Sequence, residues 1–456
     1  MKKRLASGIM AALMLCGCGS VKNGSVKDSS SSASEVLSSV EELSSAGEVS
    51  SAVKADESSQ AREVYVRPDM PAHLTQQLDI LDRAGDRFYL LTNSRYPVYS
   101  NTEVSYFPTG ESFYEALLDE LAQAEETIFL EYFIVRDGEM LGGILDILTE
   151  KIADGVDVRL LCDGFQQNDA FCEEMKGYGI DCRLYREPDH VSINERDHRK
   201  LAVIDGKTAF MGGVNLADEY INVDSPYGRW KDAAILMRGD AVRSCTELFF
   251  EQWDSGAELE NSAEYIGRAE PADAEGYVMP YGESPYDGVD AAREIYLEIM
   301  DSAEDYLYIT APYLNIDDEV EDAICSAAER GVEVIVIVPG VPDKLYMELI
   351  ARTHYERLVD SGVKLYRFTP GFIHSKLFVS DDRVATVGSV NLNSRSFYCD
   401  FECGAVLTNV PCIADIKADI LDTLAECELI TEEKIIPLTP GEEVRAAMMA
   451  NLNGMM

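Results

Sequence analysis

The sequence predicts an α/β protein made of two duplicated α/β/α sandwich domains. Three observations support this fold class. Three segments recur in the same order and spacing, which indicates an internal repeat. Stretches with helical periodicity alternate with short runs rich in β-branched residues. These runs are almost continuously apolar, which is typical of strands covered by helices on both faces of a sheet.

The repeat is visible in matching segments of the two copies. The first copy contains AEETIFLEYFIV, ADGVDVRLLCDG and DCRLYRE, and the second contains AEDYLYITAPYL, ERGVEVIVIVPG and VKLYRF. Helical periodicity predicts helices at 112–124 and 319–330, and apolar runs predict strands at 156–161 and 332–338. Each copy therefore supplies a sheet with its covering helices, and facing copies would be related by a pseudo-twofold axis.

Length and composition agree with two domains. At 456 residues with 46% hydrophobic content, the chain can bury two ordinary cores. A stretch with weak periodicity, rich in Glu, Gly, Pro and Tyr, covers 261–287 and is expected to separate them. We expect the first domain to span 61–270 and the second to span 271–456.

The N-terminus is typical of an exported protein. Met1-Lys2-Lys3-Arg4 precedes an apolar run, 5–15, that is too short to span a bilayer. Leu15-Cys16-Gly17-Cys18 follows and resembles the lipobox of bacterial lipoproteins, which implies cleavage after residue 17 and lipidation of Cys18. An ordinary secretory signal is the alternative. We expect an extracytoplasmic protein that a lipid anchor holds at the bacterial cell membrane.

Charge and composition near the N-terminus restrict the partners. The segment 18–60 is Ser-rich and acidic without aromatic residues, so it is expected to be a disordered linker. The formal net charge of −43 repels polyanions, which disfavours nucleic acid as a partner. The same repulsion acts at an anionic membrane surface, so an enzyme acting on lipids would benefit from a tether.

The cysteines give no indication of a metal. Nine follow Cys18, and they form no C-x-x-C pair and no spacing typical of zinc ligands. We expect neither a metal nor a cofactor. Because nine is odd, an exported protein would keep at least one thiol free or paired between molecules. Cys399 and Cys403 are expected to be small buried apolar residues.

The strongest chemical signal is a motif that occurs once in each copy. It reads His198-x-Lys200-x-x-x-x-Asp205 in the first and His374-x-Lys376-x-x-x-x-Asp381 in the second. Two matches at homologous places of a duplication exclude coincidence. Residues i and i+2 of a strand point to the same face, so His and Lys are expected to share one side. The apolar residues that follow carry the strand into the core. His and Lys are therefore expected at the end of the strand that faces the opening of the site.

A glycine turn and an amide follow each motif, as Gly212-Gly213-Val214-Asn215 and Gly388-Ser389-Val390-Asn391. Glycine allows close approach of the backbone, and asparagine can donate a hydrogen bond to a phosphate oxygen. We expect Asn215, Asn391 and Ser389 to bind phosphate. Facing copies would place two His, two Lys and two Asn around one tetrahedral anion.

These residues resemble the phospholipase D superfamily, and within it the bacterial cardiolipin synthases. The resemblance runs from about residue 90 to about residue 427. The doubled motif is highly specific for the superfamily. Five further segments are similar to the synthases: Arg196-Asp197-His198-Arg199-Lys200, Trp230-Lys231-Asp232, Thr310-Ala311-Pro312-Tyr313, Pro370-Gly371-Phe372-Ile373-His374 and Asn393-Ser394-Arg395-Ser396-Phe397.

The resemblance implies a ping-pong reaction through a phosphohistidine. It implies that His198 is the nucleophile and His374 the general acid, although the near-symmetric motifs leave the reverse order open. Asp232 and Glu402 stand where the family keeps carboxylates that orient the histidines, each downstream of its own motif. Asp205 and Asp381 complete the catalytic motif, but a structural role is favoured for both because they follow the buried stretch.

Other histidines and two tyrosines have weaker signals. His73, His190 and His354 lack a matching context and are expected to be surface residues or locally bonded. Tyr132 and Tyr313 are expected at equivalent strand ends, where lining a lipid entrance competes with core packing.

The implied reaction joins two phosphatidylglycerol molecules into cardiolipin and glycerol, with phospholipid as substrate. The alternatives are a hydrolytic phospholipase D that releases phosphatidic acid, a nuclease, and a non-catalytic lipid-binding lipoprotein. The charge disfavours the nuclease, and the intact His-Lys pairs disfavour the non-catalytic protein. The bacterial synthases commonly carry N-terminal membrane-spanning helices, whereas this sequence has a lipoprotein-like signal and a serine-rich linker.

Overall fold

The computed structural model describes residues 96–185, 195–254 and 262–453. The expected signal peptide, Cys18 and the expected linker lie outside the described residues, as do His73 and His190. Among the helices described, none is long and apolar enough to cross a membrane.

The first half forms a seven-stranded mixed sheet. Its strands, in spatial order, are β1 (Thr102–Phe107), β9 (Ala234–Gly239), β7 (Thr208–Gly212), β6 (Lys200–Ile204), β2 (Thr127–Tyr132), β3 (Asp157–Asp163) and β4 (Asp181–Tyr185). Its helices are α5 (Gly110–Gln123), α6 (Glu139–Ala153), α7 (Asp169–Gly177), the 3-10 helix η1 (Asp218–Ile221), α8 (Val242–Trp253) and α9 (Ala263–Ile266). Strands β2, β3 and β4 are parallel, and the other neighbours are antiparallel.

The second half repeats this order. Its sheet runs β10 (Tyr277–Glu283), β17 (Asp400–Thr408), β16 (Val384–Gly388), β15 (Leu377–Ser380), β11 (Tyr306–Thr310), β12 (Glu333–Pro339), β13 (Lys364–Phe368) and β18 (Cys427–Leu429). Its helices are α10 (Ala291–Ser302), α11 (Asp318–Glu329), α12 (Leu345–Asp360), α13 (Ser394–Tyr398), α14 (Ile413–Leu424), the 3-10 helix η2 (Glu432–Lys434) and α15 (Pro440–Asn453). Apart from the added edge strand β18, the strand order matches the first sheet, which confirms the predicted α/β fold in two halves.

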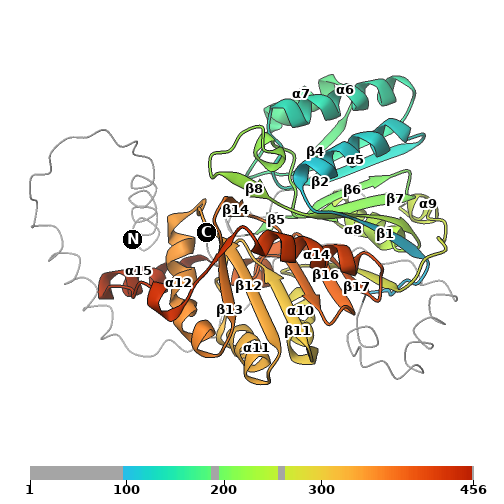
Figure 1. Ribbon diagram of the computed structural model, residues 1–456. Coiled ribbons are helices and arrows are strands. Elements are labelled where there is room, and N and C mark those ends of the chain that lie inside the picture. The colour runs from blue at the N-terminus through green and yellow to red at the C-terminus, as the bar shows by residue number, and fades with distance from the viewer. Residues whose placement is uncertain (1–95, 186–194, 255–261, 454–456) are drawn as a thin grey trace, which may run out of the picture. The chain divides into compact units, whose positions relative to one another are not determined.

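The described residues form three apolar cores. One outer core lies between the first sheet and α5, α6 and α7, and another lies between the second sheet and α10, α11 and α12. The inner core combines residues of both sheets with α8 and α14 (Figure 1). In β2, for example, Ile128 and Leu130 enter the outer core while Phe129 enters the inner one. Both faces are therefore buried, which explains why the strands read as continuous apolar runs.

Two short strand pairs connect the halves directly. Strand β5 (Arg196–Asp197) of the first half pairs in parallel with β17 of the second. Strand β14 (Gly371–Ile373) of the second half pairs in parallel with β8 (Arg229–Lys231) of the first. The β14 backbone comes so close that a Cβ on Gly371 would lie 2.3 Å from the Arg229 carbonyl oxygen. Both exchanged strands end immediately before a motif histidine.

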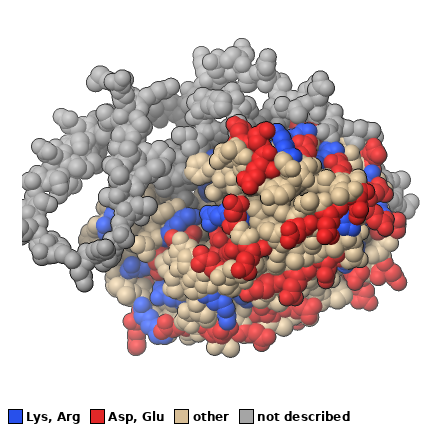
Figure 2. Space-filling model, turned by 90° about the horizontal axis from the view of Figure 1, so that it is seen from above, with Lys and Arg blue, Asp and Glu red and all other residues tan. Residues whose placement is uncertain are grey.

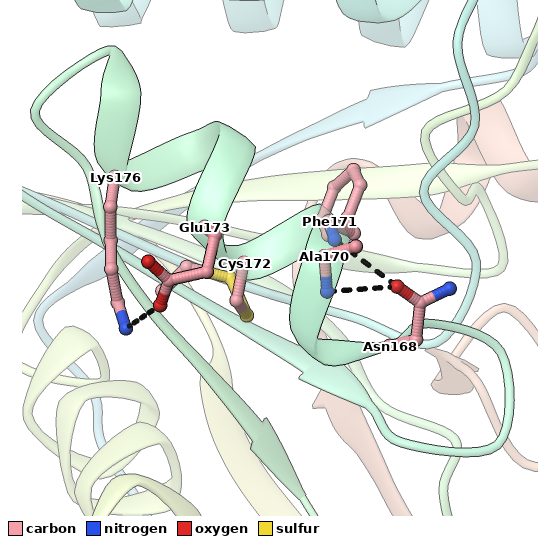
Figure 3. The surroundings of a disulfide bond; sticks show 7 residues. Asn168, Ala170, Phe171, Cys172, Glu173 and Lys176 are labelled. Atoms are coloured by element: carbon pink, nitrogen blue, oxygen red, sulfur yellow. Dashed lines mark hydrogen bonds and ion pairs between the residues drawn. A yellow bond between two sulfur atoms is a disulfide. The ribbon is translucent and has the colours of Figure 1, made fainter.

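A disulfide joins α7 to the edge strand β4 of the first sheet. It links Cys172 and Cys182 (Figure 3), and the Asn168 side chain caps the same helix by accepting hydrogen bonds from the Ala170 and Phe171 amides. Near the second motif, Cys403 is buried as expected, whereas Cys399 at the end of α13 is only partly buried. The expectation for Cys399 was wrong, because this residue caps the C-terminal end of α13 next to the exposed Tyr398.

Candidate active site

The two motif histidines each contact a carboxylate of the opposite half. The Nδ1 atom of His198 lies 2.9 Å from Oε2 of Glu402, and Nδ1 of His374 lies 2.6 Å from Oδ2 of Asp232. Such contacts orient both rings, and the contact of Glu402 leaves Nε2 of His198 available to a substrate. The sequence indicated the two carboxylates, but not that each of them contacts the histidine of the opposite half.

The exchanged strands explain why the pairs cross. Strand β5 lies beside β17, and the His198 amide donates to the Phe401 carbonyl at 2.9 Å. Strand β14 lies beside β8, and the His374 amide donates to the Lys231 carbonyl at 2.6 Å. The next residue after each acceptor is the carboxylate that contacts the histidine. Pairing of the backbones therefore positions the side chains.

The lysines lie on the same side of their strands as the histidines, as the spacing predicted. The Lys200 ammonium donates to the His198 carbonyl, and the Lys376 ammonium donates to the His374 carbonyl. Lys376 Nζ also lies 3.0 Å from both ring nitrogens of His374. Two buried cations therefore stand next to the two imidazoles.

Both histidines line a single cavity of about 530 Å³. Asn215 and Asn391 also line it, as expected. The expectation that Ser389 binds phosphate was wrong, because Ser389 is fully buried behind the cavity and donates to Glu402 Oε2 at 2.5 Å. Convergence of the two repeats on one cavity brings together two imidazoles, side chains that can act as nucleophile and as acid.

Comparison with known proteins agrees with this geometry. A family model described as "Cardiolipin synthase, PLD-like domain" matches residues 117–227 and 296–423, which is just over half of the chain. The chain belongs to the phospholipase D superfamily. Within the superfamily, its matching domain is of the cardiolipin synthase type.

Relatives and a solved structure extend the comparison. An uncharacterized protein of Streptococcus mutans is 42% identical over 76% of this chain and 77% of its own length. Cardiolipin synthase 2 of Bacillus anthracis is 33% identical over 76% of this chain and 68% of its own length. The phosphatidylserine synthase of Haemophilus influenzae shares the fold, with a TM-score of 0.61 and 16% identity over 82% of this chain and 97% of that protein.

Burial and the lysines keep both imidazoles of this phospholipase D-type site neutral before substrate binds. Burial, followed by Lys200 and Lys376, holds the pKa of His198 well below its usual range. Burial and Lys376 lower the pKa of His374 to about 3, against the opposing effect of Asp232. A bound phosphodiester adds a negative charge beside both rings and favours the protonated form that a general acid needs.

The two carboxylates differ in their protonation. Burial raises the pKa of Glu402 to about 7, although Lys200 and hydrogen bonds from Ser389 and Ser396 oppose it. Burial also acts to raise the pKa of Asp232, but His374 and Lys376 outweigh it and the net pKa is lowered. Asp232 is therefore ionised at neutral pH, and it favours a proton on His374 more strongly than Glu402 does on His198.

These shifts predict that kcat/KM passes through a maximum near pH 7. Burial lowers the pKa of Lys376 to about 7, so its attraction for a phosphate is present below that pH and is lost above it. Glu402 loses its charge as the pH falls through about 7, which weakens its support for His198. The measurement is kcat/KM between about pH 5 and pH 9. A Lys376→Arg variant, whose cation does not titrate here, should lose the alkaline decline; an unchanged alkaline limb in that variant would contradict the assignment.

The motif aspartates stand at the far ends of their strands. Asp205 accepts from the amides of Glu125, Glu126 and Thr127 at 2.7–2.9 Å. Asp381 accepts equivalently from the amides of Glu304, Asp305 and Tyr306 at 2.8–2.9 Å. Strand β6 separates Asp205 from Lys200 by roughly 16 Å at its usual rise per residue. The assignment of both aspartates to the catalytic motif is therefore corrected: their carboxylates hold loops, which is the structural role that the sequence favoured.

Replacing Asp205 with alanine should reduce stability rather than chemistry. Three backbone amides lose their acceptor, and alanine tolerates the left-handed conformation of this position, φ 55°, less well than aspartate. We expect unfolding free energy to fall by about 2–4 kcal/mol, measured by chemical denaturation. Asp205→Asn, which keeps one acceptor and tolerates this conformation, should lose less. Normal stability with abolished turnover of the alanine variant would restore a catalytic role.

Several residues around the histidines had no predicted role. Ser396 donates to Glu402 Oε1 at 2.5 Å and so shares the task of Ser389. Aromatic rings surround His374, and Phe133 lies 4.8 Å from the His198 ring centroid. In the sequence, the one indication of a role for these residues was that Trp230, Phe372 and Ser396 fall in the segments that resemble the synthases.

Two weaker expectations are also resolved. Tyr313 lines the cavity, whereas Tyr132 is fully buried in the outer core of the first half. The two were expected at equivalent strand ends, but Tyr132 still belongs to β2 while Tyr313 lies beyond β11. His354 is locally bonded, with Nδ1 3.0 Å from Oε1 of Glu321. Among the described residues, no group of three or more His, Cys, Asp or Glu is placed to hold a metal.

Proposed function

We propose that the protein transfers a phosphatidyl group from one phosphatidylglycerol to the glycerol hydroxyl of another, which yields cardiolipin and glycerol. The observation that carries this proposal is the pair of carboxylate-backed histidines in one cavity. The cardiolipin synthase-type domain and the relatives with that name support the choice of substrate.

The reaction proceeds in two displacements. Nε2 of His198 attacks the phosphorus, an N–P bond forms, and the bond from phosphorus to the glycerol oxygen breaks while His374 protonates that oxygen. The hydroxyl of the second phosphatidylglycerol then gives its proton to His374 and attacks phosphorus, which breaks the N–P bond. The ionised Asp232 beside His374 supports this order of roles, because it favours the protonated form that a general acid needs.

Product analysis tests the proposal. Purified protein is incubated with phosphatidylglycerol in mixed micelles, and lipids and glycerol are quantified by mass spectrometry. Cardiolipin and glycerol in equal amounts are expected. Phosphatidic acid as the only lipid product would show that water, rather than an alcohol, resolves the intermediate. Nucleic acid is a poor alternative substrate, because acidic side chains extend across the surface seen in Figure 2 and the net charge is −43.

We also propose that the protein works outside the cytoplasm, held by a lipid on Cys18. The signal-like N-terminus supports this location, and the Cys172–Cys182 disulfide is of a kind that persists in oxidising compartments. Alkylation of the denatured protein without reductant should leave Cys172 and Cys182 unmodified in cell-derived material. A full set of alkylated cysteines, with an N-terminus lacking a lipid, would contradict this location.

A further inference from the structure

The duplicated cavity is not chemically symmetric. Three pairs of positions are equivalent by their spacing from the motif histidines, the carboxylates and the amides. Arg196 and Phe372 lie two residues before the motif histidines, and Asp400 and Trp230 lie two residues before the carboxylates. Arg395 and Glu219 lie four residues after the asparagines. The first-named residue of each pair lies beside His198. The pairing of the exchanged strands agrees, because Arg196 is in register with Asp400 as Phe372 is with Trp230.

The side of the cavity beside His374 is aromatic. The ring centroids of Trp230, Tyr220 and Phe372 lie 5.1, 5.5 and 5.9 Å from that of His374. These rings carry no cation for an anionic group. Arg136 and Lys344 also line the cavity, but Arg136 pairs with Glu219 at 2.8 Å, and Lys344 lies 3.5 Å from Asp343 and donates to the Tyr313 hydroxyl at 3.1 Å. The equivalent positions on the other side therefore differ in charge, not only in shape.

The side beside His198 carries two guanidinium groups, which we call the arginine pair (Arg196 and Arg395). Both line the cavity. Arg395 donates to Asp400 Oδ1 at 2.9 Å, and the Arg196 guanidinium lies 4.1 Å from the centroid of the Phe165 ring. Arg196 is buried and Arg395 is mostly buried, with 15% of its side chain exposed. Burial, opposed by Arg395, raises the pKa of Asp400 to about 8, so this carboxyl competes weakly with an incoming anion for the pair.

We infer that the arginine pair binds the phosphate of the acceptor phosphatidylglycerol, as an anion subsite distinct from the place where the reacting phosphate lies. The inference rests on the proposed function. Guanidinium groups suit phosphate because they donate in a planar fork and stay charged. The acceptor carries its phosphate one glycerol unit from the attacking hydroxyl, so the two phosphates can occupy one cavity of this size. Water and free glycerol carry no such group.

The subsite gives a reason for transfer in preference to hydrolysis. An acceptor held by its own phosphate is present at a high effective concentration beside the phosphohistidine, whereas water gains nothing from the arginines. The arginine pair should therefore act on the second displacement with a lipid acceptor and leave the first displacement largely unchanged.

Two assays on the full-length protein separate these steps. Cardiolipin formation from phosphatidylglycerol needs the acceptor phosphate. Exchange of isotopically labelled free glycerol into phosphatidylglycerol uses the same histidines with an uncharged acceptor. For Arg196→Gln or Arg395→Gln we expect about tenfold slower cardiolipin formation, and about a hundredfold for the double variant. Glycerol exchange should stay within about threefold of wild type, which also shows that the variants fold.

The controls distinguish the possible results. Arg238→Gln, which removes an arginine paired with Glu120 at the surface, should leave both assays unchanged. Arg196→Lys and Arg395→Lys should keep part of the cardiolipin activity that the glutamine variants lose. Equal losses in the two assays, or no loss in either, would overturn the subsite. If wild-type protein exchanges glycerol but makes no cardiolipin, the proposed function fails and the subsite falls with it.

Discussion

Replacing His198 with alanine is expected to lower turnover by roughly 10³- to 10⁴-fold, and replacing His374 should do the same. Each imidazole has a role that the neighbouring lysines and asparagines do not take. Lys200 and Lys376 are committed to backbone carbonyls, and Asn215 and Asn391 are neither nucleophiles nor acids. The measurement is cardiolipin formation at saturating phosphatidylglycerol.

A phosphatidyl ester with a good leaving group, such as p-nitrophenol, separates the two histidines. Departure of p-nitrophenolate needs little protonation, so the His374→Ala variant should still release it in a burst and retain phosphorus on His198. The His198→Ala variant should give no burst. The opposite pattern would reverse the assigned roles, and full activity of both variants would remove the site. His354→Ala, which alters a histidine bonded to Glu321 on an outer helix, is the matched control.

Changing Asp232 to asparagine should slow cardiolipin formation by roughly 10²- to 10⁴-fold, although Asp232 belongs to the half of the chain that lacks His374. The carboxylate lies 2.6 Å from His374 Nδ1 and is fully buried, so asparagine removes a charge that water does not replace. The imidazolium that the first displacement requires then loses its main stabilising partner. Glu402→Gln should have a smaller effect, because burial holds the pKa of Glu402 at about 7 and its charge is only partly present at neutral pH.

The leaving group again gives a decisive comparison. The activated ester should recover most of the loss in Asp232→Asn, since it bypasses protonation, and little of the loss in Glu402→Gln. Glu120→Gln, at a partly buried carboxylate that pairs with Arg238 and does not line the cavity, serves as the control and should behave as wild type. Equal rescue of both variants would show that the carboxylates act on the cavity as a whole, and not through the histidine that each of them contacts in the opposite half.

Much of the fold could be predicted because its signals are local. Apolar runs such as those that became β3 and β12 indicate buried strands whatever their neighbours are. The repeat indicated two similar halves, and the matching antiparallel pairing of β2 with β6 and of β11 with β15 confirms this similarity. The role of Ser389 could not be predicted, because its spacing from Asn391 does not show that it lies behind Glu402.

By itself, the sequence determined the chemical groups and the side of each strand on which they lie. The spacing of His198 from Lys200, and of His374 from Lys376, sets their common face through the two-residue period of a strand. Only the tertiary structure decided which carboxylate serves which histidine. That choice depends on hydrogen bonds between β5 and β17 and between β8 and β14, which join residues more than a hundred positions apart, and no local pattern encodes such pairing.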